Sequence, residues 1–170
     1  MKALKDYRFL NNNDIRTMGI SLRMLLRKSI DFDVYLPSIN KNLQRPLVWT
    51  LEQKRELIWS VIIGRRIPEL SIINRYDDTL EIIDGKQRLS TLIDFYTNKF
   101  TIEEDGVEYF LKDLPEEFQL LFESYYINYC EILEWEKPFS DEFKIGWFKQ
   151  INFAGTPQEK EHLDSLVIRQ

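Results

Sequence analysis

This sequence is poor in the residues that several common chemistries require. Cysteine and histidine occur once each in 170 residues, as Cys130 and His162. A lone cysteine cannot form an internal disulfide, and the two residues together cannot supply the four ligands of an ordinary structural zinc site. Serine–histidine and cysteine–histidine catalysis need a base that a third group orients, so both are poorly supported. Carboxylate, amide, hydroxyl, lysine and arginine chemistry remains.

Long apolar runs and glycine-rich phosphate loops are also missing. No apolar stretch approaches the ~20 residues that span a membrane, and Met1–Asp6 lacks the apolar core of a signal peptide. The sequence contains neither a Gly-x4-Gly-Lys-Ser/Thr loop nor a dinucleotide Gly-x-Gly-x-x-Gly pattern. Hydrophobic residues make up 44% and aromatic residues 14%, which is enough for one domain with a real core. We therefore expect a cytoplasmic domain without membrane contact.

The net charge of −5 is unevenly distributed. Residues 1–100 contain 17 basic and 12 acidic residues, whereas the remaining 70 contain 6 and 16. An acidic total argues against a general nucleic-acid coat but allows a local basic groove. We interpret the acidic second part as a solvated surface.

The most informative stretch is Ile82–Ser90, which reads IIDGKQRLS. An apolar run stops at an Asp-Gly turn, and apolar residues then recur from Leu89 to Tyr96 at helical spacing. This pattern predicts a buried strand, a glycine turn and a helix. The unpaired N–H groups and the dipole of a helix start favour an anion, and Gly85 lets the backbone approach a ligand. A solvated strand–turn–helix corner is the alternative.

Hydrophobic spacing elsewhere predicts an α+β fold without regular βαβ alternation. Thr50 with Gln53 is typical of a capping box, and Gly64 of the end of that helix. Further helices are expected over about 20–28, over 115–122, after Ser140 and from Thr156. Strands are expected over about 32–36, 70–73, 80–83, 100–102, 107–110 and 126–133. Residues 1–14 are expected to form a loose arm before a domain over 15–170.

Three further motifs surround this stretch: Leu43–Trp49, Ile63–Pro68 and Trp147–Pro157. In this order, the motifs resemble the N-terminal domain of the GmrSD type IV restriction enzymes. That family carries an Asp-Gly-Gln-Gln-Arg signature on a ParB/sulfiredoxin-like fold. The resemblance covers about residues 36–163 and implies one α+β domain with a small mixed sheet and surrounding helices. Lys86 stands where the family has its first glutamine, which adds a charge and removes an acceptor.

The resemblance also implies a function. It suggests nucleotide binding with Mg²⁺-dependent hydrolysis of a nucleoside triphosphate, in the restriction of foreign or modified DNA such as phage DNA. A His-Asn-His nuclease domain commonly follows in the family. Nothing in this chain replaces that domain, so we expect no DNA cleavage by it alone and a separate nuclease or regulatory protein as a partner. The alternatives are a non-catalytic DNA- or protein-binding module that keeps the pocket, and an adaptor acting through the acidic half.

Asp84 and Arg88 are the predicted catalytic residues. Asp84 could ligate Mg²⁺ or orient water, and Arg88 could neutralise phosphate charge. The predicted nucleotide- and phosphate-binding residues are Gln44, Arg45, Trp49, Gly85, Lys86, Gln87, Arg88, Ser90, Thr91, Asn152 and Gly155. Asn152 and Gly155 are expected in the loop between two helices. Structural alternatives remain: Asp84 could bond its own turn, Trp49 could pack in the core, and the loop with Asn152 could be a helix cap.

Overall fold

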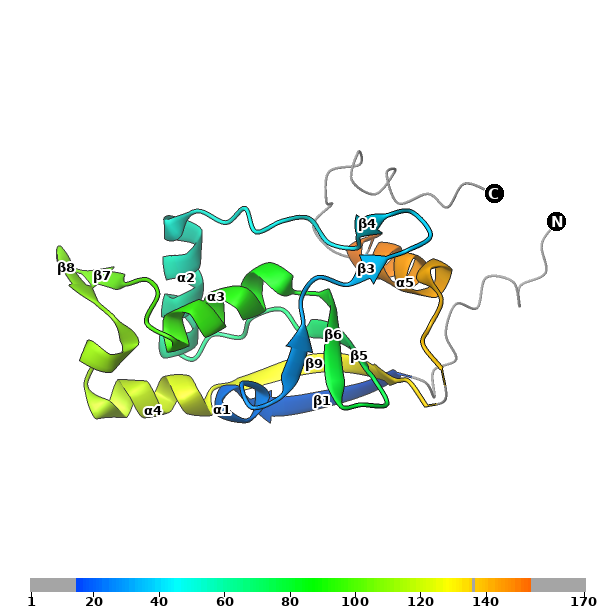
Figure 1. Cartoon of the computed structure of the whole chain (residues 1–170). Coiled ribbons are helices and arrows are strands. Elements are labelled where there is room, and N and C mark those ends of the chain that lie inside the picture. Colours follow the sequence, from blue (N-terminus) through cyan, green and yellow to red (C-terminus); the bar gives the residue numbers. More distant parts are fainter. Residues whose placement is uncertain (1–14, 136, 154–170) are drawn as a thin grey trace.

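A mixed five-stranded sheet forms the centre of the structure, a computed structural model that describes residues 15–135 and 137–153 (Figure 1). Its strands are β1 (Ile15–Ser21), β2 (Ser29–Asp31), β5 (Leu70–Asn74), β6 (Thr79–Asp84) and β9 (Tyr126–Leu133). They lie in the order β1–β9–β5–β6–β2, with β9–β5 and β6–β2 parallel and the other pairs antiparallel. The predicted α+β fold with a small mixed sheet is confirmed.

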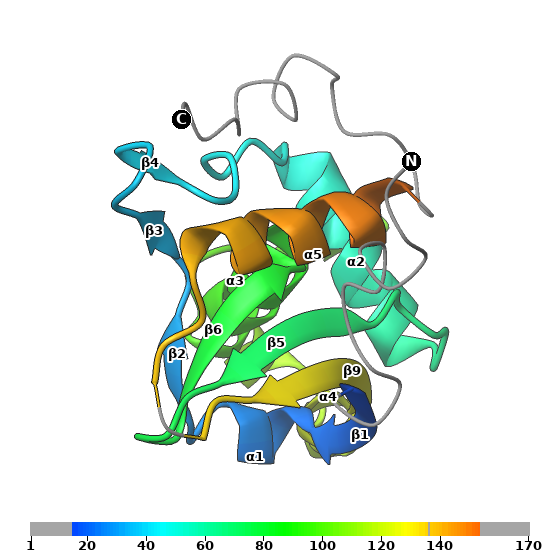
Figure 2. The same cartoon turned by 90° about the vertical axis from the view of Figure 1, so that its right-hand side faces the viewer.

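Helices cover both faces of this sheet. They are α1 (Leu22–Leu25), α2 (Leu51–Ile62), α3 (Lys86–Tyr96), α4 (Glu116–Ser124), α5 (Asp141–Phe153) and the 3₁₀ turn η2 (Leu111–Asp113). In Figure 2, α5 crosses the near face, and α2 and α3 lie on the far side. Two short ribbons complete the fold: β3 (Tyr35–Leu36) with β4 (Lys41–Asn42), and β7 (Ile102–Glu104) with β8 (Val107–Tyr109). Within the described residues, no helix is both long and apolar enough to cross a membrane.

The apolar runs of β5 and β6 supply two cores. Successive side chains of a strand point to opposite faces. Ile72 and Ile82 therefore pack in the larger core with α2, α3 and α4, while Ile73 and Ile83 pack in the smaller core with Trp147 of α5. All four isoleucines are fully buried. A sheet covered on both faces explains why these strands lack polar alternation.

Helix starts and turns follow their local signals closely. The Thr50 hydroxyl accepts from the Gln53 N–H at 3.3 Å, and the Gln53 side chain accepts from the Thr50 N–H at 3.0 Å, so the capping box of α2 is confirmed. The hairpin β7–β8 turns at Asp105 and Gly106, both with positive φ, as a two-residue hairpin turn requires. Its first strand begins two residues later than predicted.

The prediction for residues 20–36 is wrong in its boundaries. The expected helix over 20–28 is reduced to the four residues of α1, and the expected strand over 32–36 is replaced by β2 and β3. β1 was not predicted. It pairs antiparallel with β9 along its full length, so a non-local partner stabilises a segment whose own pattern is weak. Residues 1–14, His162 and the helix start at Thr156 lie outside the described residues.

Candidate functional site

The signature forms the predicted strand, turn and helix. β6 ends at Asp84, and α3 begins at Lys86. Gly85 between them has a φ of +99°, and a Cβ there would overlap the Leu70 side chain. Both the left-handed backbone and the close approach of β5 therefore require glycine. No side chain caps α3 at this position, so its first N–H groups depend on neighbouring segments.

A cavity of about 860 Å³ opens beside the start of α3. Its charged and polar lining residues are Asp33, Lys41, Asn42, Gln44, Arg45, Lys86 and Ser90. Its apolar lining residues are Phe32, Pro46 and Leu47. Three basic side chains thus face one carboxylate, which gives the cavity an excess of positive charge and favours an anionic ligand.

Lys86 is the buried member of the three basic residues. It is 7% exposed, and its Nζ forms an ion pair with Asp33 Oδ1. The Asp33 side chain itself is 66% exposed. A buried ammonium needs a partner, and here that partner is the carboxylate of the largely exposed Asp33. Neither Lys41 nor Arg45 forms an ion pair with any described residue, so both charges are available to a ligand.

Gln44 joins the cavity wall to the signature. Its Nε2 donates to the Ile82 carbonyl at 2.5 Å, and its Oε1 accepts from the Lys86 N–H at 3.3 Å. One side chain therefore bonds the last part of β6 and the first N–H of α3. Both ends of the amide are engaged, so Gln44 shapes the cavity wall and holds the backbone at the start of α3.

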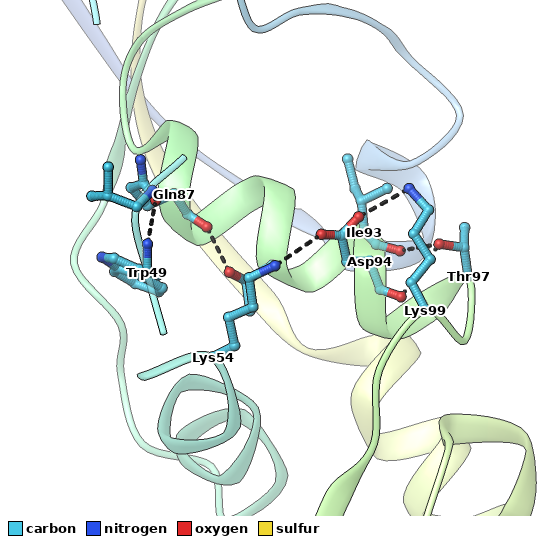
Figure 3. A network of polar contacts seen from close by, with 9 residues as sticks. Trp49, Lys54, Gln87, Ile93, Asp94, Thr97 and Lys99 are labelled. Carbon is cyan, nitrogen blue, oxygen red and sulfur yellow. Dashed lines mark hydrogen bonds and ion pairs between the residues drawn. The ribbon is translucent and has the colours of Figure 1, made fainter. Parts of the chain in front are cut away.

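Gln87 fixes the opposite part of the wall (Figure 3). Its Oε1 accepts from the N–H groups of Val48 and Trp49, at 3.1 and 3.3 Å, and its Nε2 donates to the Pro46 carbonyl at 2.8 Å. The extended segment that carries Arg45, Pro46 and Leu47 is thereby held against α3. Further along α3, Asp94 bonds Lys54 of α2 and Lys99, which ties the two helices together.

Trp49 and Thr91 contribute to packing and to helix α3, respectively. Trp49 is half-buried and packs against the larger core. Thr91 is 1% exposed, and its hydroxyl donates to the Gln87 carbonyl one turn earlier at 2.8 Å. The structure does not bring either residue to the described lining of the cavity.

Asp84 and Arg88 pair with each other. Asp84 Oδ2 lies 2.7 Å from Arg88 Nη2, and Arg88 Nη1 donates to the Glu69 carbonyl at 3.1 Å. Both side chains are largely buried, at 19% and 13% exposure. Neither residue is among the described lining residues of the cavity. The structure therefore divides the signature, with Lys86 and Ser90 at the cavity and Asp84 with Arg88 beside Glu69.

Asn152 belongs to α5 and not to the loop in which we expected it. Its Nδ2 donates to the Phe148 carbonyl four residues earlier at 2.8 Å, and the residue is 9% exposed. The helix continues to Phe153, one residue past Asn152. Gly155 lies outside the described residues.

Sequence reasoning missed Asp33, Lys41 and Phe32 as cavity residues. A buried lysine next to a turn implies a counter-charge, but nothing local to Lys86 selects Asp33 among 28 acidic residues. The pairing depends on the chain leaving β2 beside β6, which is a tertiary feature.

Cys130 is not an activated nucleophile. Burial, followed by the nearby Glu69 carboxylate, raises the pKa of its thiol, and its Sγ lies 3.3 Å from Glu69 Oε1. The thiol therefore stays protonated at neutral pH. In the described part of the chain, no three His, Cys, Asp or Glu side chains gather into a possible metal site.

The fold and the cavity define a class of protein: an α+β domain in which a strand–glycine–helix signature borders a basic, ligand-sized cavity. Residues 22–168 match the family model of the GmrSD restriction endonuclease, N-terminal domain, and the chain belongs to this family. The family relates the chain to restriction. No curated protein and no solved structure matches the chain.

Proposed function

We propose that the cavity binds the phosphates of a nucleoside triphosphate. The observation that carries the proposal is the group of Lys41, Arg45 and Lys86 around one cavity of about 860 Å³. A volume of this size is typical of small-molecule sites. The guanidinium of Arg45 matches phosphate oxygens, and Lys86 adds its charge at the start of α3, where the helix dipole also favours an anion.

The apolar part of the lining suits the base. Phe32 is half-buried, while Pro46 and Leu47 are exposed. An aromatic ring beside two aliphatic side chains offers a flat surface on which a base can lie. The ligand would then place its base toward these residues and its phosphates toward Lys86 and Arg45.

We propose that turnover uses Mg²⁺ with Asp84 as its protein ligand. Mg²⁺ in phosphate-transfer sites is commonly held by one or two carboxylates together with the substrate phosphates, so a three-carboxylate cluster is not required. Asp84 Oδ2 is engaged by Arg88, and Oδ1 makes no hydrogen bond with the described residues. The bound metal would polarise a phosphate oxygen and lower the pKa of a bound water. Arg88 would hold the carboxylate in place.

We place this activity in the restriction of foreign or modified DNA in the cytoplasm. The family match supports a role in restriction, and the single histidine of these 170 residues does not supply the two that a His-Asn-His nuclease uses. In this proposal, the domain binds and hydrolyses the nucleotide, and a separate nuclease or regulatory protein acts on the DNA.

A second candidate is a non-catalytic DNA- or protein-binding module. The observation in its favour is that both charged groups at the turn are already paired, Lys86 with Asp33 and Asp84 with Arg88. Lys86 also replaces the glutamine of the family signature. Such a module would bind an anion without hydrolysing it.

Titration with nucleoside triphosphates and measurement of phosphate release, each with Mg²⁺ and with EDTA, distinguishes the candidates. We expect saturable binding that weakens about tenfold or more in Arg45→Ala and is kept in Arg27→Ala, an exposed arginine outside the cavity. Magnesium-dependent phosphate release supports hydrolysis, whereas binding without release supports the second candidate. Absence of any nucleotide binding would reject the proposal.

A further inference from the structure

The β3–β4 ribbon supplies part of the wall of the basic cavity, but it is short. Its pairs are Tyr35 with Asn42 and Leu36 with Lys41, and both Lys41 and Asn42 line the cavity. An isolated two-stranded hairpin is marginally stable at best. The place of Lys41 in the wall therefore depends on what holds the ribbon against the rest of the fold.

The ribbon is attached to α5 in two ways, and it lies beside this helix in the views of both Figure 1 and Figure 2. Leu36 and Leu43 are fully buried in the smaller core together with Phe148 of α5. At the turn between the two strands, the Ser38 N–H donates to Asp141 Oδ2 at 2.8 Å. The apolar contacts hold the base of the ribbon, whereas the hydrogen bond holds its turn.

Asp141 can make this bond because a different residue caps its own helix. The Phe143 N–H donates to the Ser140 hydroxyl at 3.3 Å, as is typical of an N-cap residue. Asp141 follows in the first turn of α5, and its partner Ser38 lies 103 positions earlier in the chain. A hydrogen bond to an ionised acceptor is about twice as strong as a neutral one. The bond therefore stabilises the position of the ribbon on α5.

A second charged residue attaches α5 to the strand that leads to the signature. Lys144, three residues after Asp141, forms an ion pair with Glu81 of β6, with 2.7 Å between Nζ and Oε2. Both side chains are buried. β6 continues into the turn before Lys86. α5 is thus attached both to the ribbon that carries Lys41 and to the strand that leads to Lys86.

We propose that Asp141 is a positioning residue of the basic cavity: by holding the turn of the ribbon, it keeps the Lys41 ammonium where a ligand phosphate can contact it. The proposal rests on the nucleotide binding proposed above. Lys41 is exposed and has no ion-pair partner among the described residues, so the backbone of the ribbon sets where its charge lies. Asp141 does not contact the ligand and acts through Lys41.

Calorimetric titration of the full-length protein with a non-hydrolysable nucleoside triphosphate tests the proposal. Asp141→Ala and Asp141→Asn both remove the charge at the start of α5, but only the asparagine keeps an oxygen that can accept from the Ser38 N–H. Because Ser140 still caps α5 in both variants, the helix should form. We expect Asp141→Ala to weaken binding several-fold and Asp141→Asn to keep most of the affinity.

Glu142→Ala is the matched control, since it removes the exposed neighbouring charge in the same helix turn and should leave the affinity unchanged. Unchanged affinity in Asp141→Ala would overturn the proposal. Equally weak binding by Asp141→Ala and Asp141→Asn would also overturn it, because the charge at the helix start, and not the bond to the ribbon, would then be what matters.

A double-mutant cycle with Lys41→Ala shows whether Asp141 acts through Lys41. If it does, Asp141→Ala should weaken binding several-fold when Lys41 is present and hardly at all when Lys41→Ala is already in place. A general structural residue would cause the same loss in both backgrounds. Equal losses would therefore overturn the proposal.

Hydrogen exchange of the Ser38 amide in ligand-free protein separates a failure of this proposal from a failure of nucleotide binding. We expect exchange to be several-fold faster in Asp141→Ala than in the wild type or in Asp141→Asn, as measured by NMR. Unchanged exchange in Asp141→Ala would overturn the proposal whether or not a nucleotide binds. Faster exchange in a protein that binds no nucleotide would support the attachment of the ribbon by Asp141 and reject the nucleotide as the ligand.

Discussion

The two groups of charged residues at the start of α3, one at the cavity and one around Asp84 and Arg88, differ in how fully their charges are paired. On the cavity side, Lys86 is balanced only by the exposed Asp33, and Arg45 and Lys41 have no ion-pair partner among the described residues. On the other side, Asp84 and Arg88 neutralise each other and are anchored to the Glu69 carbonyl. Consecutive residues of a helix diverge by about 100°, so neighbours in one signature reach different places. The cavity side is therefore the one prepared for the phosphates, and in our proposal Asp84 would act on them only through Mg²⁺.

Gly85→Ala should have the largest effect of the variants, because the turn at Gly85 positions both the cavity residues and the Asp84–Arg88 pair. A left-handed backbone costs a non-glycine residue about 1–2 kcal/mol, and the new Cβ would also overlap Leu70. We expect the free energy of unfolding to fall by at least about 2 kcal/mol in urea titrations. Gly106→Ala is the matched control, since its φ is also positive, +77°, but no atom lies within 4 Å of its Cβ position. Equal losses in the two variants would show that the Leu70 contact contributes nothing.

Asp84→Asn should separate turnover from binding. It keeps the size of the side chain but removes the charge that would hold Mg²⁺, so phosphate release should fall at least tenfold, about 1.4 kcal/mol of barrier. Nucleotide affinity should change less, because Asp84 is not among the described cavity residues. Normal hydrolysis in this variant would mean that the catalytic carboxylate lies elsewhere.

Asp33→Asn should strengthen nucleotide binding. The Asp33 carboxylate competes with a ligand phosphate for Lys86, and the variant removes that competition at constant size. We expect affinity to rise several-fold, as judged by calorimetry, and the gain to vanish when Lys86→Gln is added. Weaker binding in Asp33→Asn would instead make Asp33 a ligand contact.

Lys86→Gln should have the smallest effect of the four. It restores the signature of the family and removes one of three basic groups, so binding at low salt should weaken a few-fold. The difference should shrink as salt screens the charge, although less than for an exposed lysine, because Lys86 is 7% exposed. Binding that is indifferent to this change at every salt concentration would remove Lys86 from the phosphate contacts.

The parts of the fold that could be predicted from the sequence have local causes. The capping box of α2, the Asp-Gly turn before α3 and the apolar runs of β5 and β6 each act within a few residues. β1 could not be predicted in this way, because its stability comes from pairing with a strand more than 100 positions away. The same distinction applies to the site.

Within the site, the signature and the motif resemblance directed attention to Gln44, Arg45, Lys86 and Ser90, which the structure places around one cavity. Asp33 was missed because its partnership with Lys86 arises only when β2 lies parallel to β6. The sequence also did not predict that Lys86 lines the cavity while Arg88 pairs with Asp84. Spacing along a helix gives the angle between two side chains, but it does not give the residues that each side chain contacts.

The central claim is that the cavity side, and not the Asp84–Arg88 side, holds the nucleotide phosphates. Calorimetric titration of Arg45→Ala and Arg88→Ala with a non-hydrolysable nucleoside triphosphate tests it most directly, with thermal unfolding as a check on the fold. A charge-assisted hydrogen bond contributes about 1.5–3 kcal/mol, so Arg45→Ala should lose roughly tenfold to a hundredfold in affinity, while Arg88→Ala should lose stability and keep most of its affinity. A large loss of affinity in Arg88→Ala, with Arg45→Ala unchanged, would contradict the account.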